Sequence, residues 1–140
     1  MSRHDDAWKA LVGAVWERID EWRKRIVVET GLPFGRTRAL RRLVDGPLSL
    51  SDLAVAMDVD RPAATVAVDD LEERGLVQRT PHPTNGRMKL VALTAAGKRM
   101  VARMVAMYDD PPPGFTELSA ADVTAVMRVA AAITRPPSRT

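Results

Sequence analysis

The stretch that decides the fold occupies residues 48–97 of this 140-residue chain. Its informative pieces, in chain order, are LSLSDLA at 48–54, DRPAATV at 60–66, LEERGLV at 71–77, NGR at 85–87 and LTAAG at 93–97. Apolar residues at helical spacing behind polar caps predict two short helices joined by a tight turn, and Asn-Gly between two apolar runs predicts a hairpin. This order predicts a helix-turn-helix followed by a basic two-stranded wing, an arrangement suited to DNA.

Capping signals set the ends of the two short helices. Ser49 is expected to cap a helix that ends near Met57. Asp60 is expected to cap the next helix, with Pro62 in its first turn, where a missing N–H costs nothing. Gly75 is expected to end that helix, because glycine readily adopts the left-handed conformation found after helix C-termini.

The second helix of the pair is the expected reading element. Ala64, Val68 and Leu71 recur at spacings of four and three, which predicts that they face the core. The residues between them then point outward, and strands expected at 76–80 and 88–93 place basic side chains beside them. The DNA-binding residues predicted from this arrangement are Ser49, Arg61, Pro62, Ala63, Thr65, Val66, Arg79, Arg87 and Lys89.

The outward residues also predict what is read. Thymine exposes a methyl group that suits Ala63, Thr65 and Val66, whereas guanine is best read by arginine. We therefore predict A·T-containing half-sites, with Arg61 as the base-reading arginine of this helix. The alternative is that Ala63 and Val66 only pack against neighbouring turns. Arg87 is expected to enter a narrow minor groove, the alternative being a salt bridge at the base of the wing.

Further helices are expected on both sides of this lobe. One spans about residues 6–30, another opens at Thr94, and the last opens at Ser119 and ends before Pro136. The first carries a heptad-like apolar stripe that is long for a small wing domain, so we favour a homodimer interface over an intramolecular helix pair. The residues predicted in that interface are Trp8, Val12, Val15, Trp16, Ile19, Val126 and Ile133.

Other side chains receive plainer interpretations. A helix at 34–44 should direct Leu40, Leu43 and Val44 inward. The four arginines at 36, 38, 41 and 42 then form a face that we interpret as solvated. The alternative is that this face contacts a phosphate or an acidic partner. The acidic residues at 69–73 are interpreted as solubilising charge and His82 as a solvated turn residue. The methionines at 100–107 are interpreted as core, the alternative being an adaptable ligand surface.

Composition narrows the functional classes. Lys and Arg total 21 against 18 Asp and Glu, a mild basic excess that is weak evidence of nucleic-acid binding by itself. The sequence contains no cysteine, which excludes disulfides and thiolate metal sites. Its two histidines lie far apart in sequence, so we expect no metal site and no cofactor. No catalytic constellation, membrane span or signal-peptide pattern stands out, so we expect a cytoplasmic protein that is not an enzyme.

Together, LSLSDLA, VDDLEERGLV at 68–77 and GR at 86–87 leading to LTAAG resemble the MarR-type winged-helix transcriptional regulators. The resemblance extends over nearly the whole chain. It implies a mainly α fold with a small β wing, a winged helix-turn-helix with N- and C-terminal dimerisation helices, in which residues 1–140 form a single domain. Dimerisation helices are expected at about 5–30 and 95–135, and a DNA-binding lobe at about 33–94.

The resemblance also implies a function. Family members are expected to be homodimers on double-stranded DNA, with recognition helices in successive major grooves and wings in the flanking minor grooves. A small aromatic or anionic effector is expected to bind between the dimer region and the DNA-binding lobe. A repressor acting on a palindromic operator is therefore the expected function, and the alternative is a winged-helix module that binds proteins.

Two departures from the family pattern bear on this choice. Asn85 replaces the aspartate of the usual Asp-x-Arg in the wing, so a neutral amide stands where an acid commonly braces Arg87. Val66 occupies a position where relatives often place arginine, and Asp69 and Asp70 add negative charge one turn later. The recognition helix is therefore poor in donors for phosphates and guanines, which gives the protein-binding alternative some weight.

Overall fold

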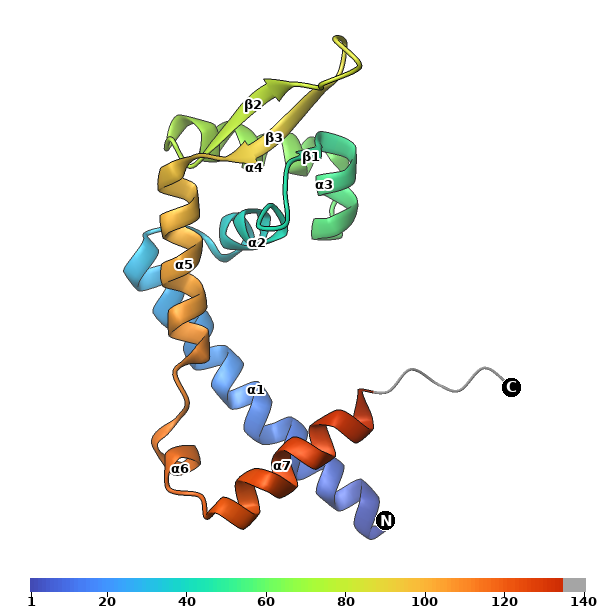
Figure 1. The fold of residues 1–140 in the computed structure, drawn as a ribbon, viewed down its shortest axis with the longest axis vertical. Helices are drawn as coiled ribbons and strands as arrows, with labels where there is room; N and C mark the ends of the chain where they lie inside the picture. The colour runs from blue at the N-terminus through green and yellow to red at the C-terminus, as the bar shows by residue number, and fades with distance from the viewer. Residues whose placement is uncertain (135–140) are drawn as a thin grey trace, which may run out of the picture. The chain divides into compact units, whose positions relative to one another are not determined.

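The computed structural model describes residues 1–134 and divides into two units, Met1–Asp109 and Asp110–Thr140. The elements of the first unit are α1 (Arg3–Thr30), α2 (Phe34–Arg42), β1 (Leu48–Ser49), α3 (Leu50–Met57), α4 (Arg61–Glu73), β2 (Val77–Pro81), β3 (Lys89–Leu93) and α5 (Ala95–Asp109) (Figure 1). The second unit contains α6 (Pro113–Thr116) and α7 (Ala120–Ile133). The predicted fold class, mainly α with a small β wing, is confirmed.

The sheet is larger than the sequence indicated. A two-stranded wing was expected, but β1 pairs with β3 to give a three-stranded antiparallel sheet in the order β1-β3-β2. Leu48 lies opposite Val91, while Val77 and Pro81 at the two ends of β2 lie opposite Leu93 and Lys89. The short first strand therefore attaches the start of the helix-turn-helix directly to the wing.

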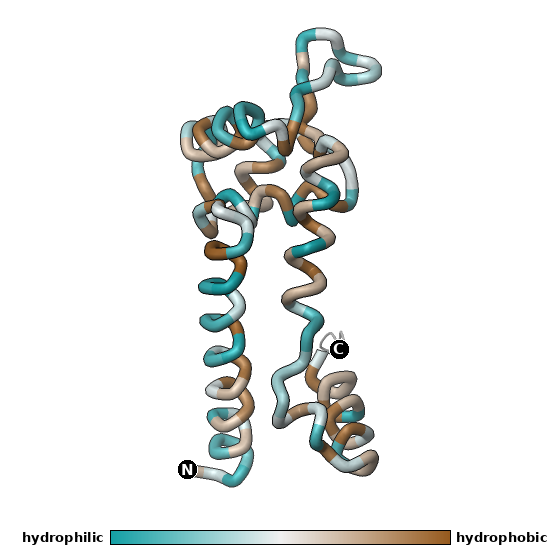
Figure 2. Tube along the Cα trace, turned by 90° about the vertical axis from the view of Figure 1, so that its left-hand side faces the viewer, coloured by the Kyte–Doolittle hydropathy of each residue, from teal (hydrophilic) through white to brown (hydrophobic). Residues whose placement is uncertain are grey.

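Each of the five helices of the first unit contributes at least one fully buried residue to the core. Ile26, Leu40, Leu53, Leu71 and Met104 each have 0% of their surface exposed. Apolar and polar segments alternate along the whole of α1, but only its later part contributes buried residues (Figure 2). The predicted inward positions Leu40 and Leu43, and Ala64, Val68 and Leu71 of α4, are confirmed, as is the interpretation of the methionines at 100–107 as core.

Two local predictions were wrong or incomplete. Val44 was expected to face inward, but α2 ends at Arg42 and the following turn leaves Val44 54% exposed. The proline-rich joint before the last helix contains a short helix, α6, which has Pro113 at its first position. The last helix begins after Ser119 as predicted and ends at Ile133, while Pro136 lies outside the described residues.

The LTAAG motif joins the end of α4 to the start of α5. The Thr94 hydroxyl donates to the Gly75 carbonyl at 2.6 Å and accepts from the Gly97 N–H at 3.1 Å. The Thr94 N–H donates to the Leu76 carbonyl at 3.1 Å. The same carbonyl lies so close to Gly97 that a side-chain carbon there would collide with it. Gly97 is therefore required by the close approach of two backbones.

We expect Gly97→Ala to lower the free energy of unfolding by about 2 kcal/mol or more, because the new methyl group must displace a backbone carbonyl. Urea denaturation followed by circular dichroism measures the change. Gly35→Ala is the matched control, since nothing lies within 4 Å of that position in α2, and it should leave stability unchanged or slightly raised. Equal stability of the two variants would contradict this account of the motif.

Candidate nucleic-acid interface

Helix α4 presents an exposed face beside the wing. The Asp60 side chain accepts the Ala63 N–H at 2.8 Å and so caps the helix, and Ala64, Val68 and Leu71 are buried as predicted. On the opposite side Val66 is 59% exposed and Arg61, Pro62 and Ala63 are also exposed, whereas Thr65 is half-buried and donates to the Arg61 carbonyl. The alternative that Ala63 and Val66 pack against neighbouring turns is therefore wrong.

A groove of about 440 Å³ lies between the start of α3, the start of α4 and the wing. We call it the wing groove, and its polar lining is Ser49, Ser51, Arg61, Arg79, Asn85, Arg87 and Lys89. Its lining residues include four cations and no carboxylate. The wing groove therefore brings together five of the predicted DNA-binding residues, while Pro62, Ala63, Thr65 and Val66 lie outside it on α4.

Three of the four groove cations are unpaired. Within residues 1–134, the side chains of Arg61, Arg87 and Lys89 form no ion pair and no hydrogen bond. A structural salt bridge for Arg87 at the base of the wing, the alternative considered above, is therefore wrong. These three side chains remain available to an external anion, which is the property that a phosphate-binding surface needs.

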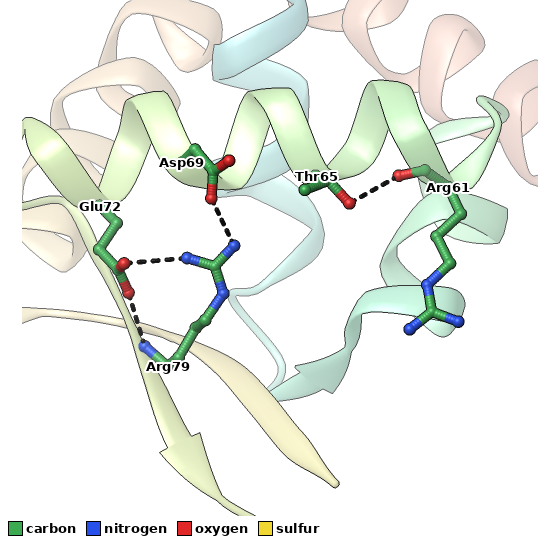
Figure 3. Close-up of polar contacts among 5 residues, drawn as sticks. All are labelled: Arg61, Thr65, Asp69, Glu72 and Arg79. Carbon is green, nitrogen blue, oxygen red and sulfur yellow. Dashed lines mark hydrogen bonds and ion pairs between the residues drawn. The ribbon is translucent and has the colours of Figure 1, made fainter.

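Arg79 differs from the other groove cations, because carboxylates of α4 already hold its guanidinium (Figure 3). Its Nη2 lies 2.6 Å from Asp69 Oδ1, its Nη1 lies 2.9 Å from Glu72 Oε1, and its backbone N–H donates to the same Glu72 side chain at 3.2 Å. The hydrogen bond to Asp69 raises the pKa of the Arg79 guanidinium above its ordinary value. Arg79 therefore joins β2 to α4.

The remaining acidic side chain in the middle of α4 is also paired. Asp70 accepts from Arg36 of α2 at 2.9 Å and from Arg74 at 3.0 Å. The hydrogen bond from Arg36, and then that from Arg74, lowers the pKa of the Asp70 carboxyl below its ordinary value. The interpretation of these acids as solubilising charge was wrong, because Asp69, Asp70 and Glu72 all hold neighbouring elements.

The arginines of α2 are likewise more than a solvated face. In addition to the Arg36 pair, Arg38 donates to the Met57 carbonyl at 2.9 Å, at the C-terminus of α3. Arg41 stacks over the Trp22 ring with its guanidinium carbon 5.1 Å from the ring centroid. These contacts attach α2 to α1, α3 and α4, so the interpretation of this face as only solvated was wrong.

Ser49 is placed mainly by its capping role. Its hydroxyl accepts the Asp52 N–H at 3.1 Å, which confirms the predicted cap, and the residue is only 6% exposed. The hydroxyl proton is not used by that bond. Ser49 therefore lines the wing groove as a nearly buried hydroxyl.

The tip of the wing is ordered by its own side chains. The Asn85 side-chain oxygen accepts the Arg87 N–H at 3.2 Å, so the amide braces the backbone of Arg87 instead of its guanidinium. His82 Nδ1 accepts the backbone N–H groups of Thr84 and Asn85, each at 3.2 Å. His82 is thus more than a solvated turn residue, and the sequence offered no signal for this role except its position between two prolines.

Comparisons with known proteins agree with this geometry. A sequence model described as MarR family matches residues 30–88, which include the helix-turn-helix and most of the wing. Over these residues the chain is similar to the MarR family. A curated relative from Thauera aromatica, named a putative transcriptional regulatory protein for the hcr operon, is 36% identical over 85 residues, which are 60% of this chain and 51% of the relative. The match therefore spans about half the length of that relative.

Solved structures resemble this chain over nearly its full length. RV1404 from Mycobacterium tuberculosis is 27% identical with a TM-score of 0.73 and covers 99% of both chains. CouR from Rhodococcus jostii, solved with p-coumaroyl-CoA bound, is 27% identical with a TM-score of 0.65 and covers 100% of this chain and 99% of its own. A MarR family protein from Bacillus stearothermophilus is 18% identical with a TM-score of 0.77, a likeness of fold alone.

The residues predicted for a MarR-type dimer interface are largely on the surface of this chain. On α1, Trp8 is 59% and Trp16 is 56% exposed, Val15 is exposed, and Val12 and Ile19 are half-buried. On α7, Val126 and Ile133 are exposed and no described residue is buried. The apolar stripe of α1 therefore divides, because Trp22 and Ile26 join the core of the first unit while its earlier part lacks cover from that core.

A second hollow, of about 500 Å³, lies between α1, α2 and α5. We call it the arginine pocket, and its lining is Ile19, Trp22, Arg23, Phe34, Arg38, Arg41, Arg42 and Tyr108. Arg23 stacks on Phe34 at 4.4 Å, and the Tyr108 ring centroid lies 5.2 Å from that of Trp22. Trp22 is 5% exposed, and its Nε1–H lacks a hydrogen-bond partner among residues 1–134.

Two other kinds of site receive no support from the described residues. Across residues 1–134 the structure contains no cluster of three or more His, Asp or Glu side chains arranged to hold a metal ion. No helix in that range combines the length and the apolar character needed to cross a bilayer. The wing groove and the arginine pocket each bring together four cations from more than one element.

The Arg79 contacts predict a stability effect that separates it from Arg87. We expect Arg79→Ala to lower the free energy of unfolding by about 1 kcal/mol, because two carboxylates lose their charged partner. Arg87→Ala is the matched control and should stay within about 0.5 kcal/mol of the parent, since that side chain has no partner in the described residues. Urea denaturation measures both, and equal losses would refute the assignment of Arg79 to the α4–β2 connection.

Proposed function

We propose that the protein is a DNA-binding transcriptional regulator that acts as a homodimeric repressor on a palindromic operator. The observation that carries this proposal is the wing groove, where Arg61, Arg87 and Lys89 have no partner among residues 1–134 and lie beside the exposed face of α4. Unpaired cations around a groove without carboxylates attract phosphates, and releasing counterions from DNA provides most of the sequence-independent affinity. Such a regulator would act in the cytoplasm, where the DNA is.

Base reading would come from α4. The helix places Ala63 and Val66 on its exposed face, where they suit the methyl group of thymine, and Arg61 supplies one base-reading cation. The pairing of Asp69, Asp70 and Glu72 with arginines removes much of the negative charge that would repel DNA from this helix. This pairing weakens the case for a protein-binding module, which rested on the acidity of α4.

A homodimer would supply the second half-site and cover apolar surface. Trp8 and Trp16 on α1 and Val126 and Ile133 on α7 are exposed, and an apolar surface of this kind is typical of protein interfaces. Two recognition helices related by a twofold axis read half-sites about 34 Å apart. The predicted interface residues therefore support the dimer and, through it, the palindromic operator.

The DNA-binding proposal is tested by titrating DNA from upstream of the protein's own gene at two salt concentrations. We expect salt-sensitive binding, and we expect Arg87→Ala to weaken binding to all sequences while lowering the log–log salt slope by about 1. The loss should be about tenfold on non-specific DNA and larger on the operator, where a narrow minor groove favours an inserted arginine. Lys24→Ala on α1 is the charge-matched control, because Lys24 lies outside the wing groove. An unchanged affinity for Arg87→Ala would show that the wing does not contribute to DNA binding.

The same titration decides between the two functions. No retardation of any DNA at low salt would overturn the regulator and favour a module that binds proteins. Sequence-specific retardation that weakens with salt supports the regulator.

We also propose that the arginine pocket binds a small aromatic anion that releases the protein from DNA. Four arginines supply charge, three aromatic rings supply stacking surfaces, and the unpartnered Trp22 Nε1–H supplies a donor for a carboxylate oxygen. CouR, which resembles this chain at 27% identity, was solved with p-coumaroyl-CoA. Because Arg38 and Arg41 of this pocket also bind α3 and α1, an occupant would act on the placement of the DNA-binding lobe.

This effector proposal predicts a ligand response that depends on Arg42. We expect benzoate, p-coumarate or p-coumaroyl-CoA to raise the melting temperature, and Arg42→Gln to weaken the effective ligand by about tenfold through loss of one charged contact. Arg99→Gln, an exposed arginine on α5 outside the pocket, is the control. If none of the three compounds shifts the melting temperature, or if both variants respond like the parent, the pocket assignment fails.

A further inference from the structure

The backbone donors at the tip of the wing converge on one imidazole. Residues 82–88 connect β2 to β3, and Pro83 among them has no N–H. The next two N–H groups, of Thr84 and Asn85, both donate to His82 Nδ1 at 3.2 Å, and the Thr84 hydroxyl lies 3.3 Å from the same atom. A single nitrogen lone pair therefore organises the first half of the tip.

The other half of the tip is attached to the first by further hydrogen bonds. The His82 N–H donates to the Met88 carbonyl at 2.9 Å, and the Met88 N–H donates to the Asn85 carbonyl at 3.0 Å. The Asn85 side chain then accepts the Arg87 N–H at 3.2 Å. The contacts that fix the backbone of Arg87 thus lead back, through Asn85, to the ring of His82.

These contacts require the neutral ring. Nδ1 accepts a hydrogen bond only while it carries no proton, which places the proton of the neutral imidazole on Nε2. Protonation converts Nδ1 into a donor that faces two backbone donors, and the present tip conformation then loses both bonds. The tip offers little to replace them, because every residue from 83 to 88 is exposed.

The charges around the hairpin do not favour a protonated ring. The sequence contains no Asp or Glu between residues 74 and 108, so the hairpin itself carries no anion. Arg87 lies in the tip, Arg79 and Lys89 lie on the two strands, and the nearest acids on α4, Asp69 and Glu72, are paired with Arg79. Protonation of His82 would therefore add a cation among cations without an internal counter-ion.

We propose that His82 is a positioning residue of the wing: its neutral imidazole holds the tip in the conformation that presents Arg87, and its protonation releases the tip. The inference rests on the proposed DNA-binding function and adds a pH dependence to it. Binding to non-specific DNA depends on charge and gains from an extra proton. Binding to the operator depends also on where Arg87 is held, so acid should lower the ratio of operator affinity to non-specific affinity.

The decisive experiment compares that affinity ratio at pH 8 and pH 5.5, a window that brackets ordinary imidazole titration, in the parent, His82→Asn and His82→Ala. Asparagine accepts backbone N–H groups from the residues that follow it and does not titrate, so it is the conservative replacement. We expect the parent ratio to fall about tenfold on acidification, the size typical of losing a fixed specific contact. His82→Asn should keep a high ratio at both pH values, and His82→Ala should give a low ratio at both.

His4→Asn controls for other titrations, because His4 is the only other histidine and lies in α1. It should show the parent profile. If the parent and His82→Asn change equally between the two pH values, or if His82→Ala keeps the parent ratio at pH 8, the proposal is overturned.

A measurement without DNA separates failure of this inference from failure of the proposed function. In the free protein, amide hydrogen exchange at Thr84 and Asn85 should be at least about fivefold slower in the parent than in His82→Ala at pH 8 and should become equal to it at pH 5.5. Equal exchange at pH 8 would overturn the role of His82 even if DNA binding is intact. Slow exchange in a protein that binds no DNA would support the role of His82 in the tip and would overturn the proposed regulator function.

Discussion

The placement of α4 is the constraint on which the rest of the structure depends. Its inner face buries Val68 and Leu71 in the core, one side is held to α2 by the Arg36–Asp70 pair, and the other side is held to β2 by Arg79. A helix fixed in this way can expose only one face. That face carries Ala63 and Val66, and its N-terminal end forms one wall of the wing groove.

The same contacts explain how an acidic helix can serve a surface that is basic. Counted along the sequence, α4 carries four acids between residues 69 and 73, which argues against DNA binding. In the structure, Asp69, Asp70 and Glu72 are each within 3.0 Å of an arginine nitrogen, and two of these arginines come from other elements. The field that an approaching phosphate meets is set by these pairs together with the unpaired cations of the groove, so counting charge within one helix is misleading.

Much of the fold could be predicted because its signals are local. The caps at Ser49, Asp60 and Ser119 need only the residues that follow them, and the helical spacing of buried residues is visible in any short window. The strand β1 was missed because two residues carry no periodicity and become a strand only by pairing with Val91 and Leu90, more than 40 positions away. Val44 was misplaced because the apolar pattern continues one turn beyond the helix that it predicts.

The candidate site was predictable in its members but not in their partners. Residue types and their order sufficed to predict Arg61, Arg79 and Arg87 as DNA-binding residues. The structure gives them different surroundings. Arg79 contacts Asp69 and Glu72 across the α4–β2 turn, whereas the other two contact no acid among the described residues. The Arg36–Asp70 pair joins residues 34 positions apart, and no local pattern marks it. Sequence patterns identify which charges are present, whereas function depends on which of them remain unpaired after folding.

Two parts of the wing are therefore stabilised by different physics. Its base is held to α4 by the ion pairs of Arg79 with Asp69 and Glu72. Its tip is held by hydrogen bonds to one imidazole nitrogen, which accepts them only while it carries no proton. Arg79 and Lys89 on the strands can therefore keep their positions when the tip is released. The contact of Arg87 with the operator is gained or lost with the conformation of the tip.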